Sequence, residues 1–252
     1  NCFMKQIPNI FTLLNLFFGC IAIVFALQNT IEITADGQFV RLTEELYYAS
    51  LFIGIAAVID FLDGFVARAL NASSEMGKQL DSLADVVSFG AAPSIILYQF
   101  LRMSFIRENE GVETSMLWLM PAFVFACAGA YRLARFNLDT EQSFGFKGVP
   151  IPAAGLVVAS LPLIYWNMQT EMVYTILMNK WFLYGLIILL SFLMVSKLPL
   201  MALKFKDFSI KSNLPKFILV GIAVVTALLL KWLAIPIIFI AYIILSLLHK
   251  RN

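Results

Sequence analysis

Long apolar runs recur along this chain, and they restrict its fold more than any other feature of the sequence. Several runs reach the roughly 20 residues that a helix needs to cross the hydrocarbon core of a bilayer. Hydrophobic residues fill 61% of the 252 positions and charged residues only 13%, whereas a soluble domain carries about 25% charged residues. The mean hydropathy is +0.86. The sequence therefore predicts an all-α fold, a polytopic transmembrane helix bundle that forms one integral membrane domain over residues 1–252, with no nucleic acid among its partners.

About eight membrane spans are predicted from the apolar runs. They cover roughly residues 10–28, 46–67, 81–101, 117–136, 152–168, 175–195, 214–231 and 233–249. The last two are separated by little more than Lys231 and Trp232, and Pro236 could kink the eighth, which membrane helices tolerate.

The basic residues predict how these spans are oriented. With the N-terminus inside, 13 of the 18 Lys and Arg residues fall in the cytoplasmic segments. Because cytoplasmic loops carry an excess of Lys and Arg, this distribution places both termini in the cytoplasm. The predicted location is the cytoplasmic (inner) membrane, which the chain crosses several times.

Four carboxylates lie where an apolar chain should have none. Asp60 follows the run LFIGIAAVI, Asp63 comes three residues later, and Asp81 and Asp85 are four residues apart at the start of the next span. Positions three or four apart share one face of a helix, so each helix can present two carboxylates to its neighbour across an antiparallel hairpin. The pattern predicts a carboxylate cluster near the cytoplasmic face.

This cluster has the donor atoms of a divalent-cation site. The chain has one histidine and three cysteines without CxxC spacing, so the ligands are hard oxygens, which suit Mg²⁺, Mn²⁺ or Ca²⁺ better than Zn²⁺. Two such ions side by side form a common clamp for displacement at phosphorus. Gly64 and Gly77 allow a phosphate to approach the backbone, and Arg68 can bind it.

Two other interpretations of the acids compete with a metal site. A single Asp near a helix end is usually a cap or a solvated terminus, but four at these spacings need a common explanation. A cation- or proton-coupled transporter would also use membrane carboxylates. Transporters often contain internal repeats and spread their acids through the membrane, whereas this chain has no visible repeat and its acids gather at one face.

The acidic stretch also resembles a known signature. From Asp60 onward it reads D-x2-D-G-x2-A-R-x8-G-x3-D-x3-D, which is similar to the signature of the CDP-alcohol phosphatidyltransferase family. The segment PNIFTLLN (8–15) resembles the one that opens the family's first core helix. Three later segments resemble the phosphatidylserine synthase branch of the family: DSLADVVSFGAAPS (81–94), AGAYRLARFN (128–137) and FKGVPIPAAG (146–155). The resemblance implies a six-helix catalytic core, here about residues 1–195, followed by a C-terminal helical extension over 196–252.

The resemblance implies a reaction as well. A hydroxyl, in this branch that of L-serine, would attack the lipid-side phosphorus of CDP-diacylglycerol and release CMP. Other members use glycerol 3-phosphate, inositol phosphate or choline, and the residues alone do not choose among these alcohols. The family is expected to use Mg²⁺ or Mn²⁺, with two ions in the site, and to form homodimers.

The family's site residues carry over by position. Asp60, Asp63, Asp81 and Asp85 would bind metal, and Asp85 is the candidate general base toward the hydroxyl. The CDP-lipid would be bound by Gly64, Ala67, Arg68, Gly77, Asn9 and Thr12.

Serine or phosphate binding is assigned to three further residues. Arg132 and Arg135 could pair with a carboxylate or phosphate, or they could be ordinary cytoplasmic anchors. Ser88 could line the alcohol pocket, or it could bond to backbone within the helix packing. The run from Lys197 to Lys216 is expected to contact anionic lipid headgroups.

Overall fold

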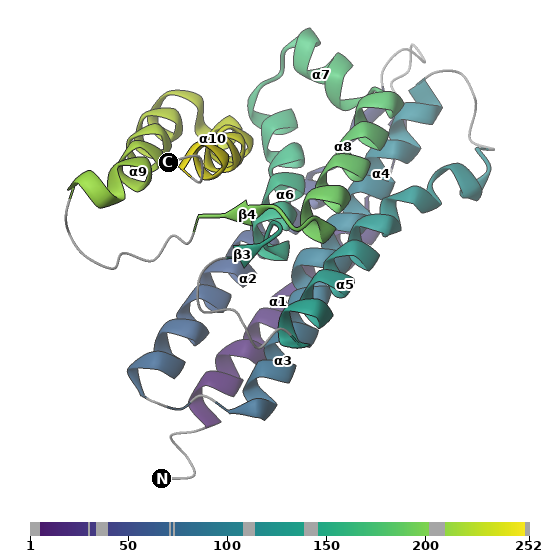
Figure 1. Ribbon diagram of the computed structural model, residues 1–252. Coiled ribbons are helices and arrows are strands. Elements are labelled where there is room, and N and C mark those ends of the chain that lie inside the picture. Colours follow the sequence, from purple (N-terminus) through teal and green to yellow (C-terminus); the bar gives the residue numbers. More distant parts are fainter. Residues whose placement is uncertain are drawn as a thin grey trace.

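The computed structural model confirms a helix bundle, shown in Figure 1. It describes residues 6–29, 31–33, 40–70, 72, 74–107, 114–138, 146–201 and 210–249. The helices are α1 (Ile7–Leu27), α2 (Glu44–Ala69), α3 (Glu75–Asp85), α4 (Ala92–Arg107), α5 (Val124–Leu138), α6 (Ile151–Asn167), α7 (Glu171–Leu177), α8 (Lys180–Val195), α9 (Ile210–Leu230) and α10 (Ala234–His249). Two short antiparallel pairs complete the fold, β1 (Ile31–Ile33) with β2 (Val40–Leu42) and β3 (Phe146–Lys147) with β4 (Pro199–Leu200).

The number of spans is where the structure departs from the predicted eight. Within the described residues, five helices are long and apolar enough to cross a membrane, or six if the bent pair α7 and α8 is one span. Helix α6 is apolar but shorter, and residues Asn213–Leu248 count as a single helical run. The bundle class is confirmed, and the count of eight is not.

Helices α3 and α4 belong to one 33-residue run, Glu75–Arg107, with a π-helical turn over Val86–Ala91 inside it. The run starts cleanly because the Ser74 side chain accepts a hydrogen bond from the Gly77 backbone N–H at 3.0 Å, the usual N-cap arrangement. Such π turns often occur at functional sites. This one directly follows Asp85 and contains Ser88.

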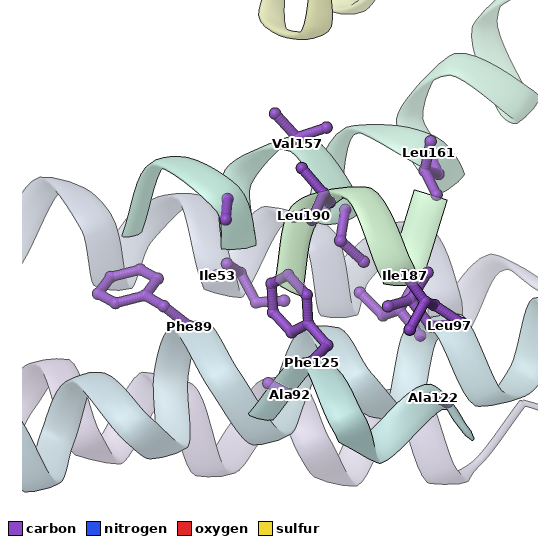
Figure 2. Packing of buried hydrophobic residues seen from close by; sticks show 14 of the residues in the cluster. Ile53, Phe89, Ala92, Leu97, Ala122, Phe125, Val157, Leu161, Ile187 and Leu190 are labelled. Atoms are coloured by element: carbon purple, nitrogen blue, oxygen red, sulfur yellow. The ribbon is translucent and has the colours of Figure 1, made fainter. Parts of the chain in front are cut away.

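The buried hydrophobic core lies between α2, the π turn, α5, α6 and α8. Figure 2 shows Ile53 of α2, Phe89 of the π turn, Phe125 of α5, Val157 of α6 and Leu190 of α8 among the residues of this core, all buried. This packing positions α3 and its carboxylates, because α3 contacts α1 and the π turn that follows it contacts α1, α5 and α6.

Strand β3 precedes α6 and β4 follows α8, so their pairing links the start of α6 to the end of α8. The turn from β3 into α6 depends on Gly148, which has a φ of +80°. A Cβ on Gly148 would lie 2.5 Å from the Met194 carbonyl oxygen. Only glycine fits such a position without strain.

The C-terminal pair α9 and α10 lies beside α6, on the side away from α5 (Figure 1). It is tied down at Met201, whose N–H donates to the Ser246 hydroxyl at 3.2 Å and whose carbonyl accepts from the Tyr242 hydroxyl at 2.9 Å. The run Lys197–Lys216 leads into this pair, but residues 202–209 lie outside the described part of the chain, so the expected headgroup contact stays a prediction.

Candidate active site

The four acids come together at the facing ends of α2 and α3. Asp60, Asp63 and Asp81 each offer one carboxylate oxygen, and these three oxygens all lie within 4.8 Å of one another. Asp60 also lies within hydrogen-bonding reach of Asp81 and of Asp85. Helical spacing therefore does place the carboxylates as two facing pairs.

Because the acids are buried, the repulsion between their negative charges is energetically unfavourable unless a cation is bound. Asp63 and Asp85 are each only 6% exposed, and like charges repel strongly where water is scarce. One oxygen of Asp85, Oδ1, has no hydrogen-bond partner among the described residues. Arg68 is the basic side chain whose charge acts on Asp63. An all-oxygen donor set with an unpartnered buried oxygen fits one or more hard divalent cations.

Helix α1 supplies a hydrogen bond to this donor set. The Thr12 hydroxyl donates to Asp63 Oδ2 at 2.8 Å, and it also lies 3.2 Å from the Pro8 carbonyl of its own helix. Thr12 is buried. Since groups that bond to a ligating carboxylate orient it, Thr12 would orient Asp63 if this carboxylate binds a metal ion. Thr12 also lines the cavity beside the acids, so its predicted contact to the CDP-lipid stays a prediction.

A cavity of about 550 Å³ opens beside the carboxylates. Its lining is Pro8, Asn9, Thr12, Asp63, Gly64, Ala67, Ala72, Ser74, Glu75, Gly77, Lys78 and Asp81. It therefore unites most of the residues assigned to the CDP-lipid with two of the acids. Arg68 is exposed, and its guanidinium lies close to Gly64. Arg68 is therefore adjacent to the cavity but is not one of its lining residues.

One glycine of the cavity lies close to two polar side chains. A Cβ on Gly77 would lie 3.1 Å from both Asn9 Oδ1 and Ser74 Oγ. A side chain there would require Asn9 and Ser74 to shift by a few tenths of an ångström. At Gly64 a Cβ would meet only the Arg68 guanidinium, at 3.4 Å, so this glycine leaves room on the α2 side.

The three residues assigned to serine or phosphate separate in the structure. Ser88 is fully buried and donates to the Asn15 carbonyl at 3.0 Å, which is the packing role that the sequence left open. Arg135 donates to the carbonyls of Val195 and Ser196 at 2.7 and 3.1 Å, and so caps the end of α8. None of the three lines the 550 Å³ cavity as the described residues form it.

Arg132 is the one of the three that interacts electrostatically with an acid of the cluster. It is 5% exposed, and its charge interacts with that of Asp85. Its Cζ atom lies 5.2 Å from the centre of the Phe136 ring, and its Nε atom has no hydrogen-bond partner in the described part of the chain. A buried guanidinium with a free donor is suited to an anionic group.

Asn15 is a polar residue of this region that the sequence reasoning missed. Its side chain is fully buried, and neither Nδ2 nor Oδ1 finds a partner among the residues described. An unsatisfied buried amide is costly, which makes Asn15 a candidate contact for a ligand. The available signal was its place in PNIFTLLN, three residues after Thr12 and so on the same helix face. Ser74, Glu75 and Lys78 were missed as well, because only the folded hairpin brings them to the cavity.

The fold and site together define a class: a membrane helix bundle whose clustered carboxylates could hold a divalent cation beside a cavity. Comparison with known proteins gives the family. The model for CDP-alcohol phosphatidyltransferase matches residues 5–195, and the chain belongs to this family.

Curated relatives agree with this membership. The chain is 36% identical over 221 residues to a CDP-diacylglycerol–serine O-phosphatidyltransferase of Helicobacter pylori (strain J99), covering 84% of this chain and 77% of the relative. A protein of the same name from Mycobacterium bovis is 31% identical over 254 residues, 95% of this chain and 76% of the relative. Another from Bacillus subtilis is 33% identical over 162 residues, 64% of this chain and 78% of the relative.

Proposed function

We propose that this protein transfers the phosphatidyl group of CDP-diacylglycerol to L-serine, giving phosphatidylserine and CMP. The observation that carries the proposal is the cluster of Asp60, Asp63 and Asp81 oxygens within 4.8 Å of one another, beside a 550 Å³ cavity. The names of the relatives supply the acceptor, since those proteins act on serine.

The four acids are the proposed metal ligands. Asp60, Asp63, Asp81 and Asp85 would hold Mg²⁺ or Mn²⁺, in our proposal as two ions, and Thr12 would keep the Asp63 carboxylate in place. Bound cations would offset the negative charge of the pyrophosphate and of the leaving CMP. Arg68, at the rim of the cavity, would add a positive charge on the phosphate side.

The cavity is the proposed nucleotide site. Gly64, Ala67 and Gly77 present little side-chain bulk there, so the cytidine and pyrophosphate can approach the backbone of both helices. Asn9 lies across from Gly77 and offers an amide for a hydrogen bond to the nucleotide.

Asp85 is the proposed general base. Its carboxylate would accept the proton of the serine hydroxyl while the serine oxygen forms a bond to the lipid-side phosphorus and the bond to CMP breaks. Arg132, which interacts with Asp85, would pair with the serine carboxylate. Ser88 and Arg135 stay predictions for this pocket. In the structure both side chains donate hydrogen bonds to backbone carbonyls.

We further propose that the protein lies in the cytoplasmic membrane with its active site and both termini facing the cytoplasm, and that it works as a homodimer. The excess of Lys and Arg in the segments assigned to the cytoplasm supports the orientation.

The test is CMP release by the purified protein. CDP-diacylglycerol would be supplied with Mg²⁺ or Mn²⁺ and, in parallel, with serine, glycerol 3-phosphate, inositol phosphate or choline. Release that depends on serine, with phosphatidylserine as the lipid product, is expected. Asp60→Asn serves as the inactive control. Release with another alcohol but not with serine would overturn the acceptor and leave the family chemistry standing.

A further inference from the structure

Asn15 is a buried amide of α1 that the helix packing does not use. Its side chain is fully buried, and neither Nδ2 nor Oδ1 makes a hydrogen bond to any residue that the structure describes. The backbone at this position is held, because the Ser88 hydroxyl donates to the Asn15 carbonyl at 3.0 Å. An amide that is buried without partners lowers stability, whereas an apolar side chain of similar size would not. The packing alone therefore gives no reason for an asparagine here.

Contacts between α1 and α2 place Asn15 at the depth of Asp60. Thr12 bonds to Asp63 at 2.8 Å, and a ring contact farther along α1 is made with an earlier part of α2, so the two helices are antiparallel. Three residues beyond the bond to Asp63, about 4.5 Å along the helices, lie Asn15 on α1 and Asp60 on α2. Since positions three apart share a helix face, Asn15 lies on the side of α1 from which Thr12 contacts the acids.

Contacts between α1 and α3 place Asn15 near the depth of Asp85 as well. Asn9 lies opposite Gly77, and farther along both helices the Asn15 carbonyl meets Ser88, so α1 and α3 run in the same direction. From the first of these contacts, Asn15 is six residues along α1 and Asp85 eight residues along α3, about 9 and 12 Å. The Oδ1 atom of Asp85 is likewise buried without a partner among the described residues. The amide and this carboxylate oxygen thus lie at nearly one level of the bundle.

A third group, Arg132, approaches Asp85 from α5. It is buried, its charge interacts with that of Asp85, and its Nε atom has no partner in the part of the chain that is described. Helices α1 and α5 both contact the π turn that follows Asp85. Three helices therefore bring a neutral amide, a carboxylate and a guanidinium to the start of this turn.

These three groups match the three polar groups of L-serine. Asp85 is the proposed base for the hydroxyl, and Arg132 has the charge that suits the carboxylate. The ammonium group needs a hydrogen-bond acceptor, and Asn15 Oδ1 supplies one without adding a fifth negative charge beside the four acids. The other alcohols differ from serine at this point: glycerol 3-phosphate and inositol phosphate have no ammonium group, and the quaternary ammonium of choline has no hydrogen to donate.

We propose that Asn15 is a specificity-determining residue, whose Oδ1 atom accepts a hydrogen bond from the ammonium group of the acceptor. Its Nδ2 atom then donates to a carboxylate oxygen of the acid cluster, so that both atoms of the amide have a partner. The proposal rests on the proposed function and deepens it, because it names the chemical group that selects serine: a protonated primary amine on the carbon next to the hydroxyl-bearing carbon.

The test compares L-serine with 3-hydroxypropionate, which keeps the hydroxyl and the carboxylate but lacks the ammonium group. CMP release from CDP-diacylglycerol gives kcat/KM for each acceptor. If 3-hydroxypropionate is not a substrate, its inhibition constant against serine replaces kcat/KM. Asn15→Leu removes both amide atoms at similar size, and Asn15→Asp keeps an acceptor oxygen. Asn15→Ala replaces the leucine variant if that protein does not fold.

Gln99→Leu is the matched control. Gln99 is also a buried amide with an unpartnered oxygen among the described residues. Its Nε2 atom donates to the Ala26 carbonyl at 2.8 Å, near the other end of α1. Gln99 is 14 residues after Asp85, about 20 Å along the helical run, so its loss should leave the choice of acceptor unchanged.

In Asn15→Leu the preference for L-serine over 3-hydroxypropionate should fall about 10- to 100-fold, the range for a lost hydrogen bond to a charged group. The change should appear in KM for serine, with KM for CDP-diacylglycerol little altered. Asn15→Asp and Gln99→Leu should keep the preference of the unaltered protein.

An unchanged preference in Asn15→Leu would overturn the proposal. So would an equal fall in kcat/KM for both acceptors together with a higher Mg²⁺ or Mn²⁺ requirement, which would assign Asn15 to the metal site. Absence of serine-dependent CMP release by the unaltered protein is a different result, and it would overturn the proposed function itself.

Discussion

Thr12 ties α1 to the carboxylates of α2 through one hydroxyl. Its hydrogen bond to Asp63 Oδ2 is 2.8 Å long and buried, so no water molecule replaces it readily. The hydroxyl can donate only once, and the carboxylate gains more from it than the Pro8 carbonyl does, because bonds to charged acceptors are stronger. The position of the Asp63 carboxylate thus depends on a residue from a different helix.

Thr12→Val keeps the shape of this side chain and removes the bond. We expect the Mg²⁺ or Mn²⁺ concentration for half-maximal CMP release to rise about 10- to 100-fold, as is typical when a group that orients a metal ligand is lost. Thr226→Val is the control, since the Thr226 hydroxyl bonds only backbone carbonyls of α9. The same metal requirement in both variants would show that Thr12 has no part in the site.

Asp85 differs from the other three acids in having a buried oxygen, Oδ1, without a hydrogen-bond partner among the described residues. Asp85→Asn keeps the size of the side chain but cannot accept the proton of the attacking hydroxyl. Turnover should fall by about 10²- to 10⁴-fold, the range for a lost general base, whereas binding of CDP-diacylglycerol, measured by calorimetry, should change little. Turnover close to that of the unaltered protein would assign the base to another group.

At the scale of elements, α1 and the π turn approach each other more closely than side chains normally allow. A Cβ on Gly19 would lie 2.2 Å from Ser88 Oγ and 2.8 Å from its Cα. Small residues at such crossings let membrane helices pack closely. The contact holds α1 beside the start of α4 and keeps Thr12 near Asp63.

Gly19→Ala should therefore lower the thermal unfolding midpoint in detergent, by the equivalent of about 1–3 kcal/mol of overpacking. Gly185→Ala faces open space among the described residues, so it should leave the midpoint unchanged or raise it slightly through helix propensity. If the two variants unfold at the same temperature, the close contact between Gly19 and Ser88 does not exist in solution.

At the scale of the whole molecule, the orientation of the bundle determines from which side of the membrane substrates reach the site. The charge distribution predicts that the loop between α2 and α3 lies inside and the loop before α7 outside. Gln79 and Met172 are exposed residues near these two loops. Gln79→Cys and Met172→Cys, each made in a chain whose three native cysteines are replaced, report on the orientation.

In intact cells a membrane-impermeant maleimide should label Met172→Cys and leave Gln79→Cys unmodified until the membrane is broken. CDP-diacylglycerol is then bound from the cytoplasmic side. The opposite labelling pattern would reverse the orientation of the whole chain, including the active site.

The class of fold and the members of the carboxylate cluster could be predicted from the sequence. Apolar runs of about 20 residues in a chain with few charges are longer than a soluble core needs, so they predict membrane helices. The spacing of Asp60, Asp63, Asp81 and Asp85 follows the helix repeat, and local geometry is enough to pair them. The number of spans does not follow from the sequence in the same way, because length and apolarity do not say whether Asn213–Leu248 crosses the membrane once or folds back at Lys231.

The roles of the polar side chains became visible only in the folded chain. Ser88, Arg132 and Arg135 look alike in sequence as polar residues near a span end. In the folded chain Ser88 bonds to α1, Arg132 interacts electrostatically with Asp85, and Arg135 caps α8. The burial of Asn15 could not be predicted from the sequence either, because it depends on helices distant in sequence. The physical reason is that hydrophobicity and helical period act within one segment, whereas hydrogen-bond partners and cavities arise only where separate segments meet.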